Sequence, residues 1–538
     1  MSNSVFDAEH LLFTPASPDR DAVPTIFAFP NEYTVGITSL GYQVVWATLA
    51  MRSDLDVRRL FTDVHESLPR SPELVGFSLS WELDYVNILN LLEFLETPIR
   101  STNRGDNDPL VFGGGPVLSA NPEPFADFFD VILVGDGEDL LGNFITAYQE
   151  VRTADRLTKL HRLAQVPGIY IPRLYQVEYD DNLITAIVPI DSSTPLTITK
   201  QTYRGNTLSA STVVTEKAAW ENIFMVEVVR SCPEMCRFCL ASYLTLPFRV
   251  ANVEESLIPA IDNGLQVTNR LGLLGASVTQ HPEFPALLAH LAQPKYDDVR
   301  LSVSSVRTNT VTVQLAETLA KRDSKSLTIA VESGSERIRK IVNKKLETDE
   351  IFQAATNAKA GGLKGLKLYG MVGIPGEEIG DVEETVKMLR SVKKAVPGLR
   401  LTFGCSTFVP KAHTPFQWFG VNKEADKRLK LLQKQLTTQG IEFRPESYNW
   451  SMIQAIISRG DRRISHLLEL TRSYGDSIGS FRRAFKELRG QIPELDFYVH
   501  QTWDTSQILP WNHLLGPLPK PTLIKHLESA TEQFAIAN

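Results

Sequence analysis

Two series of short apolar runs, each alternating with helix-like stretches, constrain this chain more than any other feature. The first series spans residues 23–160 and the second spans residues 216–420. Strands that alternate with helices pair into parallel sheets, so both series predict an α/β fold. The first predicts a doubly wound sheet. The second has six repeats, which predicts a partial or complete (β/α)6 barrel with strands at 223–229, 271–277, 300–306, 326–332, 365–373 and 400–408.

Three other segments complete the expected domain organisation. Residues 1–22 show no periodicity and are interpreted as an N-terminal arm. Residues 161–215 contain short β-like runs separated by Pro, Asp and Asn, which predicts a β-rich connector. Residues 421–538 show helical periodicity, which predicts a mainly helical region. We interpret its Arg and Lys side chains as solvated helix faces.

Composition and charge exclude several classes of protein. The chain has 538 residues, of which 43% are hydrophobic and 22% charged, so it can bury a large core. Its net charge of −8 does not indicate a nucleic-acid or membrane-surface partner. No apolar run approaches the roughly 18 residues that a membrane span needs, and the N-terminus does not resemble a signal peptide. We therefore expect a cytoplasmic protein without a membrane partner.

Three of the four cysteines lie within eight residues, directly after the run at 223–229. Cys232, Cys236 and Cys239 form the pattern C-x3-C-x2-C. Soft thiolates on one loop can hold three irons of a [4Fe–4S] cluster, which leaves the fourth iron open to a small molecule. A zinc knuckle would need a fourth ligand close by, and the nearest histidine is the unpaired His281. The spacing therefore predicts an iron–sulfur site.

With Phe238 before its last cysteine, the motif resembles that of the radical S-adenosylmethionine (SAM) superfamily. The resemblance implies that the open iron binds SAM. It also implies that one electron, from a reductant such as ferredoxin or flavodoxin, cleaves SAM to a 5′-deoxyadenosyl radical. The implied SAM contacts are Phe238 beside the adenine, the backbone of Gly370, Gly373 and Gly376 along the adenosine, and Glu332 and Ser333. The glycine-glycine-glutamate signature usual after the second strand is missing, so the contact to the SAM amino group stays unassigned.

The first series resembles the N-terminal cobalamin-binding domain of some members of this superfamily. In that arrangement a glycine-rich sheet edge forms a floor for the corrin, here Gly113, Gly114, Gly115, Gly135, Gly137 and Glu138. Glycine allows backbone to approach a flat ligand closely. The motif D-x-H-x-x-G, which supplies a histidine to cobalt, is absent. The nearest approximation contains His65, which we interpret as a surface residue. The sequence thus favours cobalamin bound without a protein histidine.

Three functions remain open at this point. The first is a cobalamin-assisted radical methyltransferase that acts on an unactivated carbon. The second is a non-methylating radical SAM enzyme whose cobalamin domain has degenerated, and the third is a non-catalytic iron–sulfur protein. Methylthiolation is disfavoured, because residues 1–231 contain no cysteine for an auxiliary cluster.

Parallel barrels carry their reactive groups at the carboxyl ends of the strands. Cys405, Lys411 and His413 follow or end the sixth strand and are expected at that mouth, and Cys405 and His413 are the weak catalytic candidates. Transfer between two cofactors requires that Gly113 and Gly135 face the same cavity. We therefore predict that the N-terminal domain docks over the barrel opening.

Overall fold

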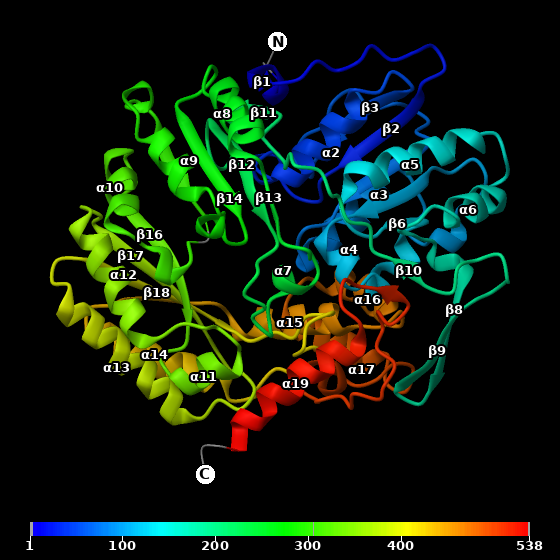
Figure 1. The fold of residues 1–538 in the computed structure, drawn as a ribbon. Coiled ribbons are helices and arrows are strands. Elements are labelled where there is room, and N and C mark those ends of the chain that lie inside the picture. The colour runs from blue at the N-terminus through cyan, green and yellow to red at the C-terminus, as the bar shows by residue number, and fades with distance from the viewer. Residues whose placement is uncertain (1–3, 305, 536–538) are drawn as a thin grey trace.

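The first alternating series forms five strands of a six-stranded sheet in the order β3-β2-β4-β5-β6-β7 (Figure 1). The edge strand β7 comes from the segment 161–215, which the sequence assigns to the connector. The computed structural model describes residues 4–304 and 306–535. Five strands are parallel and the edge strand β7 is antiparallel. Because β2 lies between β3 and β4, the strand order reverses there, and ligands bind beyond the carboxyl ends of strands at such a reversal. The strands are β2 (Val23–Ala28), β3 (Leu55–Leu60), β4 (Leu74–Ser78), β5 (Leu110–Gly114), β6 (Val131–Leu133) and β7 (Ile169–Tyr170).

Helices cover both faces of this sheet, as a doubly wound fold requires. The longer helix after β2 begins next to Ser39, whose side chain accepts a hydrogen bond from Tyr42 N. The helices are α1 (Tyr33–Gly36), α2 (Leu40–Ala50), α3 (Tyr85–Phe94), α4 (Pro116–Ala120), α5 (Gly137–Glu150) and α6 (Arg156–Ala164). Together they confirm the fold class expected for the N-terminal part.

The second series forms six parallel strands in chain order, which confirms the partial barrel. Backbone hydrogen bonds join the strands into two four-stranded sheets, and a parallel bridge between Val306 and Ile329 connects the two. The sheets end at the short strands β13 (Arg249–Val250) and β19 (Glu442–Pro445), which do not pair with each other. The six strands are β12 (Ile223–Arg230), β14 (Arg270–Gly275), β15 (Arg300–Val303), β16 (Ser326–Glu332), β17 (Gly365–Val372) and β18 (Arg400–Thr407).

The barrel helices pack on the outer side of these strands (Figure 1). Each returns the chain from the carboxyl edge to the amino edge of the next strand. They are α8 (Ile258–Gly264), α9 (Phe284–Leu291), α10 (Val313–Lys321), α12 (Thr348–Ala360) and α13 (Ile379–Ala395). The single turn α7 (Leu240–Tyr243) and the short helix α11 (Glu336–Ile341) instead lie beside the cysteine loop at the carboxyl edge.

The arm and the connector are tied to the rest of the molecule by short strands. Strand β1 (Glu9–Leu11) of the arm pairs with β11 (Val213–Thr215), so the arm is more ordered than its sequence predicts. The connector also forms a hairpin of β8 (Tyr175–Asp180) and β9 (Leu183–Pro189). Its strand β10 (Ile198–Thr199) pairs with β20 (Leu514–Leu515) near the C-terminus.

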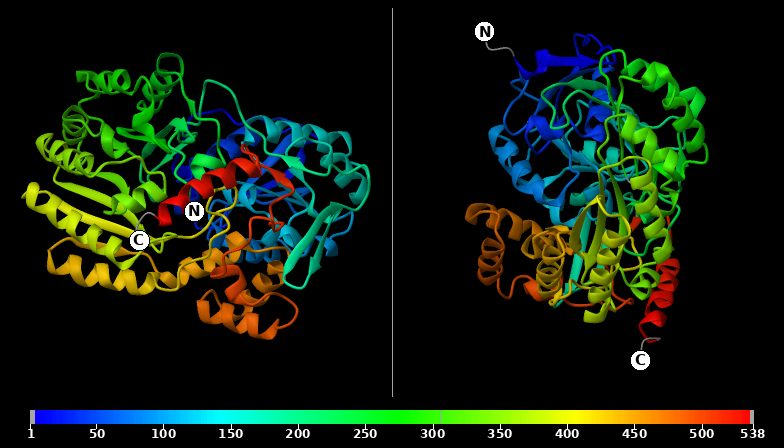
Figure 2. Two further views of the ribbon diagram at one scale, coloured as in Figure 1. Left: turned by 60° about the horizontal axis from the view of Figure 1, so that its bottom comes forward. Right: turned by 90° about the vertical axis from the view of Figure 1, so that its left-hand side faces the viewer.

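The C-terminal part is mainly helical, as expected. Helices α15 to α18 pack below the N-terminal sheet, and α19 returns across the barrel side of the molecule (Figure 2, left). None of the described helices combines the length and hydropathy that a bilayer-spanning segment requires. The helices are α14 (Ala425–Thr438), α15 (Tyr448–Arg459), α16 (Ile464–Tyr474), α17 (Ile478–Glu487), α18 (Leu495–Val499) and α19 (Lys520–Ala535).

The interpretation of the C-terminal arginines as solvated is wrong for three neighbouring residues. Arg459 is buried, donates to the carbonyls of Tyr498 and Gln501, and stacks on Trp503. Arg462 pairs with Glu123 of the N-terminal domain at 3.0 Å. Arg463 reaches two carbonyls of the β8–β9 turn. These side chains join the C-terminal helices to the N-terminal domain and the connector instead of facing solvent.

Candidate functional site

The three clustered cysteines lie on a loop that a second segment holds in place. The loop follows β12 at the carboxyl edge of the barrel and turns through Ser231 and Met235, both at positive φ. Asn343 donates its side-chain N–H groups to the carbonyls of residues 234 and 235, at 3.1 and 2.9 Å. Arg237 donates to the carbonyls of residues 340 and 341. The loop therefore depends on residues 340–343 for its shape.

The thiols are suited to a metal cluster and not to solvent. Cys236 is 7% exposed, and burial raises the pKa of its thiol to about 12. Burial also raises the pKa of Cys239. The positive charge of a bound metal deprotonates a coordinating thiol, which offsets the effect of burial. Within the described residues, no three His, Cys, Asp or Glu side chains are arranged to hold a single metal ion. Three soft thiolates on one loop are the kind of donor set that iron–sulfur clusters use.

A cavity of about 440 Å³ opens directly beside the cysteines. Charged side chains line it in pairs: Glu332 with Lys344 at 2.8 Å, and Glu234 with Arg307 at 3.2 Å. Glu332 lies at a β-bulge with φ of +63°, a strained conformation that turns it out of the strand. The lining residues are Cys232, Glu234, Cys236, Phe238, Cys239, Ala241, Ser242, Ala276, Ser277, Val306, Arg307, Thr328, Ala330, Glu332, Lys344 and Tyr369.

Of the residues expected to contact SAM, the structure brings only some to this cavity. Phe238 and Glu332 line it. Ser333 instead lies beside Thr385, 3.4 Å between their hydroxyl oxygens. The glycines of the 370–376 stretch lie outside the lining. A side chain at Gly370 would meet the carbonyl of Glu332, one at Gly373 would meet α14, and one at Gly376 would meet Phe534. At these positions glycine lets the chain pass close to its neighbours.

The lining residues that sequence reasoning missed include three charged side chains and one aromatic one, namely Glu234, Arg307, Lys344 and Tyr369. Two of them could have been predicted from the sequence. Lys344 belongs to the same loop-and-helix segment as Glu332, and Tyr369 immediately precedes Gly370. Arg307 had no signal, because its partner Glu234 lies far away in the sequence.

The two weak catalytic candidates lie elsewhere. Cys405 is 2% exposed within the barrel core, beside Gly370 in the register of β17 and β18. His413 is buried at the junction with the N-terminal domain, where its Nε2 lies 3.1 Å from the carbonyl oxygen of Ala120. Burial lowers the pKa of His413 to about 4. Lys411 pairs with Glu82 of the N-terminal domain. The segment after β18 thus contacts that domain.

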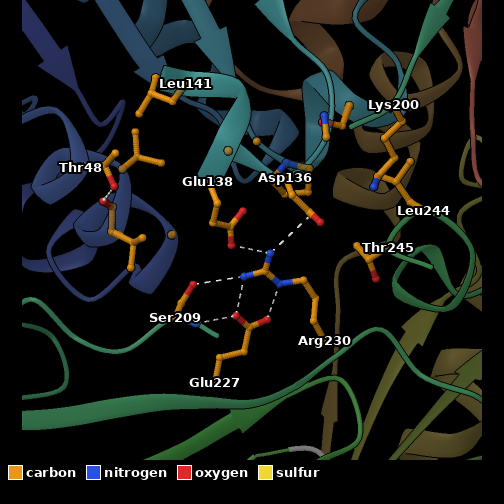
Figure 3. A pocket seen from close by; sticks show the side chains of 18 residues that line it. Thr48, Asp136, Glu138, Leu141, Lys200, Ser209, Glu227, Arg230, Leu244 and Thr245 are labelled. Carbon is orange, nitrogen blue, oxygen red and sulfur yellow. Dashed lines mark hydrogen bonds and ion pairs between the residues drawn. The ribbon is translucent and has the colours of Figure 1, made fainter. Parts of the chain in front are cut away.

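A second cavity, of about 330 Å³, lies between the N-terminal sheet and the barrel (Figure 3). Gly115, Gly135, Gly137 and Glu138 line it from the carboxyl edge of the sheet. Gly113 and Gly114 lie outside the lining, and a side chain at Gly113 would collide with Phe129 and Leu118. The remaining lining residues are Gly41, Val44, Val45, Thr48, Pro116, Ser119, Asp136, Leu141, Lys200, Ser209, Glu227, Arg230, Leu244 and Thr245.

Arg230 connects the two domains within this cavity (Figure 3). Its guanidinium pairs with Glu138 of α5 and with Glu227 of β12, both at 2.7 Å, and lies 3.6 Å from Asp136. Two residues further along the chain, Cys232 lines the cluster-side cavity. The carboxyl edge of the N-terminal sheet therefore faces β12 and the start of the cysteine loop. Of the two glycines expected to face a shared cavity, Gly135 lines this one and Gly113 does not.

His65 contributes nothing to this second cavity. It is exposed, and its Nδ1 lies 2.7 Å from the carbonyl oxygen of Glu66. Among the described residues that line the cavity, none is a histidine. The structure thus places His65 at the surface, as predicted.

Three thiols at the carboxyl edge of a partial α/β barrel, beside a cavity with paired charges, define an iron–sulfur protein whose cluster can bind a small molecule. The model for the radical SAM superfamily matches residues 226–389, and a model for the N-terminal part of radical SAM proteins matches residues 41–172. The chain belongs to the radical SAM superfamily. It is a radical SAM enzyme that works with a [4Fe–4S] cluster and SAM and needs a reductant.

Two relatives with different names are similar in sequence to this chain over part of its length. An uncharacterized protein of Methanocaldococcus jannaschii is 29% identical over 85% of this chain and 93% of its own length. A tRNA-2-methylthio-N(6)-dimethylallyladenosine synthase of Wolbachia sp. subsp. Brugia malayi is 25% identical over 40% of this chain, which spans about half (51%) of that relative.

Two solved structures are similar in part. The radical S-adenosylmethionine methyltransferase TsrM from Kitasatospora setae has a TM-score of 0.49 and 14% identity, covering 73% of this chain and 75% of that one. The cobalamin-dependent S-adenosylmethionine radical enzyme OxsB has a TM-score of 0.49 and 11% identity, covering 95% of this chain and 80% of that one.

Proposed function

We propose that this protein is a cobalamin-dependent radical SAM methyltransferase that methylates an unactivated carbon of an organic substrate. One observation carries the proposal: the glycine-bearing edge of the N-terminal sheet and the strand that leads into the cysteine loop line one cavity. A corrinoid there would lie next to the cluster side of the barrel, which methyl transfer between two cofactors requires. The cytoplasm, with its reducing thiol pool, is the setting we propose.

The residues of the second cavity fit a flat ligand. Gly41 and Gly137 face it without side chains. An added Cβ at Gly41 would meet no atom within 4 Å, and one at Gly137 only Val45, at 3.8 Å. Val44, Val45 and Leu141 supply apolar contact from α2 and α5. With no histidine in the described lining, a corrinoid would bind without a protein ligand to cobalt. When bound, it would supply a methyl group carried on cobalt.

On the barrel side, the residues beside the cysteine loop would hold the cluster and SAM. Cys232, Cys236 and Cys239 would hold the cluster, which supplies reductive cleavage of SAM when it is bound. Phe238 would contact the adenine, and Glu332, fixed by Lys344, would contact another polar part of SAM. Of these groups, Cys236 and Glu332 are buried, which would keep water away from their side of the cavity.

A non-methylating radical reaction is the second candidate, and the ion pairs of Arg230 favour it. A guanidinium paired with Glu138 and Glu227 occupies space that a corrinoid would need. In that case the enzyme would cleave SAM without binding cobalt. Methylthiolation, the activity in the names of several relatives, lacks support, because residues 1–231 contain no cysteine.

Cobalt content after anaerobic purification with hydroxocobalamin tests the proposal. We expect about one cobalt per chain, together with the visible absorption of a corrinoid. Gly41→Phe fills the cavity and should lower corrinoid affinity at least about tenfold, the equivalent of ~1.4 kcal/mol. The matched control is Gly142→Phe on α5, which is also free of contacts within 4 Å and lies outside the lining.

Two results would contradict the proposal. One is iron-replete wild-type protein that cleaves SAM yet retains no cobalt, which would favour the non-methylating candidate. The other is a tenfold fall in corrinoid affinity on His65→Ala, because that residue is exposed and outside the cavity.

A further inference from the structure

The reductive chemistry of this superfamily needs an external electron, so one surface of the molecule must receive a donor. The thiol of Cys236 lies 3.7 Å from the carbonyl oxygen of Asn343. Asn343 is half-buried, and it follows α11 within the segment that wraps the cysteine loop. Residues 340–345 are therefore an outer wall of the cluster site.

This wall carries an unusual charge for an acidic chain. Residues 337–346 contain five cationic side chains and no carboxylate, whereas the whole chain has a net charge of −8. Three of the five are compensated within the fold. Arg337 pairs with Asp381, buried Arg339 lies 3.8 Å from Glu336, and Lys344 pairs with Glu332.

The remaining two cations, Lys340 and Lys345, have exposed side chains. Lys340 is exposed at the last turn of α11. The Lys345 side chain is 56% exposed, and its ammonium is 3.8 Å from Glu234, a carboxylate that Arg307 and Gln280 already hold more closely. The backbone carbonyl of Lys340 accepts a hydrogen bond from Arg237, which lies between two cluster ligands in the sequence. Two positive charges thus stand beside the cysteine loop.

We propose that the surface of Lys340 and Lys345 is the docking site of an acidic one-electron carrier protein. The inference rests on the radical SAM activity and not on cobalamin. In the complex, the carrier is oxidised by one electron and the cluster is reduced by the same electron, without transfer of an atom. Opposite charges steer such partners together. Because the chain as a whole is acidic, an acidic carrier is repelled by its net charge and attracted at this surface.

Cross-linking of the complex tests the location directly. Holoenzyme is mixed with an acidic flavodoxin and treated with a zero-length carbodiimide, which joins lysine amines to carboxylates in contact. We expect peptides cross-linked through Lys340 or Lys345. Cross-links confined to other lysines would overturn the proposal, and this result does not depend on turnover.

Charge reversal tests the same surface kinetically. In Lys340→Glu/Lys345→Glu, the flavodoxin concentration for half-maximal SAM cleavage should rise about tenfold at low salt, and less at high ionic strength. Cleavage driven by dithionite should not change, because this small reductant needs no docking. The control, Lys321→Glu/Lys359→Glu, reverses two exposed lysines in the last turns of α10 and α12, at the opposite end of the barrel.

The outcomes separate this proposal from the proposed function. Equal flavodoxin dependence in both double variants would overturn the docking site, whatever the cobalt content. Failure of wild-type protein to cleave SAM with dithionite would instead contradict the radical SAM activity. If the reversal disturbs folding and lowers the dithionite rate, the neutral variant Lys340→Gln/Lys345→Gln and the cross-links of unaltered holoenzyme decide.

Discussion

At the scale of single residues, the four cysteines divide into three that we propose as cluster ligands and one core residue. Cys232, Cys236 and Cys239 line one cavity, whereas Cys405 is buried among apolar side chains of the barrel. The sequence motif predicted this division for the triad, because ligands on one loop are close in sequence. For Cys405 it could not, since the register of β17 and β18 decides which way the thiol points.

Each cysteine of the triad should be indispensable to the cluster. Cys236→Ala is expected to leave iron and sulfide near zero after anaerobic reconstitution, because two remaining thiolates cannot retain the cluster. Iron and sulfide analysis and electron paramagnetic resonance measure the result. Cys405→Ala is the matched control and should retain a full cluster. Iron-replete Cys236→Ala protein would refute the ligand assignment.

At the scale of elements, α19 is the segment whose importance the sequence concealed. Ser529 accepts a hydrogen bond from Arg237 of the cysteine loop, and His526 lies 2.9 Å from the hydroxyl of Tyr243. Ala530 is fully buried in an apolar cluster, against which Phe238 and Phe534 pack. A helix distant in sequence therefore covers the back of the cluster loop.

Detaching α19 should make the cluster easier to lose. Ala530→Asp places an unpaired carboxylate in that apolar cluster, at a cost of several kcal/mol that undocking relieves. We expect a chelator to remove iron about tenfold faster than from wild type. Thr531→Asp, at the next and exposed position, is the control and should match wild type. Equal chelation rates for the two variants would show that α19 does not retain the cluster.

The strands show how far local pattern reaches. All six barrel strands begin within one residue of their predicted positions, because each carries apolar residues in a short run or at alternate positions. Strand β3 escaped prediction. Its Arg59 is 2% exposed, pairs with Glu9 and Glu66, and stacks on Trp46. When the partners of a buried charged residue are distant in sequence, the sequence alone does not distinguish that residue from one at the surface.

At the scale of the whole molecule, buried polar groups hold the C-terminal region to the N-terminal domain. Arg462, Tyr170 and His513 surround Glu123, which is 1% exposed. His413 bonds to the same domain from the segment after the barrel. The partners are hundreds of residues apart, so no local pattern could predict that Arg462 is buried.

This junction should weaken in mild acid. Burial lowers the pKa of both His413 and His513 to about 4, against 6.5 for the free side chain. Between these values the unfolded chain binds more protons than the folded one, so stability falls as the pH drops from about 6.5 to about 4. Each histidine contributes up to about 3 kcal/mol to this loss. Urea unfolding at pH 7, 6 and 5 measures it.

Comparison of variants isolates the two histidines from the carboxylates that titrate in the same range. His413→Gln and His513→Gln should each reduce the dependence of the unfolding midpoint on pH. His65→Gln, which alters an exposed side chain, should leave that dependence unchanged. A slope that is identical in all three variants would exclude the buried histidines as its cause.

Strand β12 has a consequence for how binding in one cavity affects binding in the other. Its last residue contributes Arg230 to the interdomain cavity, and two residues later Cys232 lines the cavity beside the cluster loop. A ligand in either cavity contacts the same short segment of backbone at the end of β12. Thermodynamic reciprocity then applies: whatever factor the first ligand imposes on the affinity of the second, the second imposes on the first. The affinity of each cavity for its ligand therefore depends on whether the other cavity is occupied, and a measured affinity has to be given together with that occupancy.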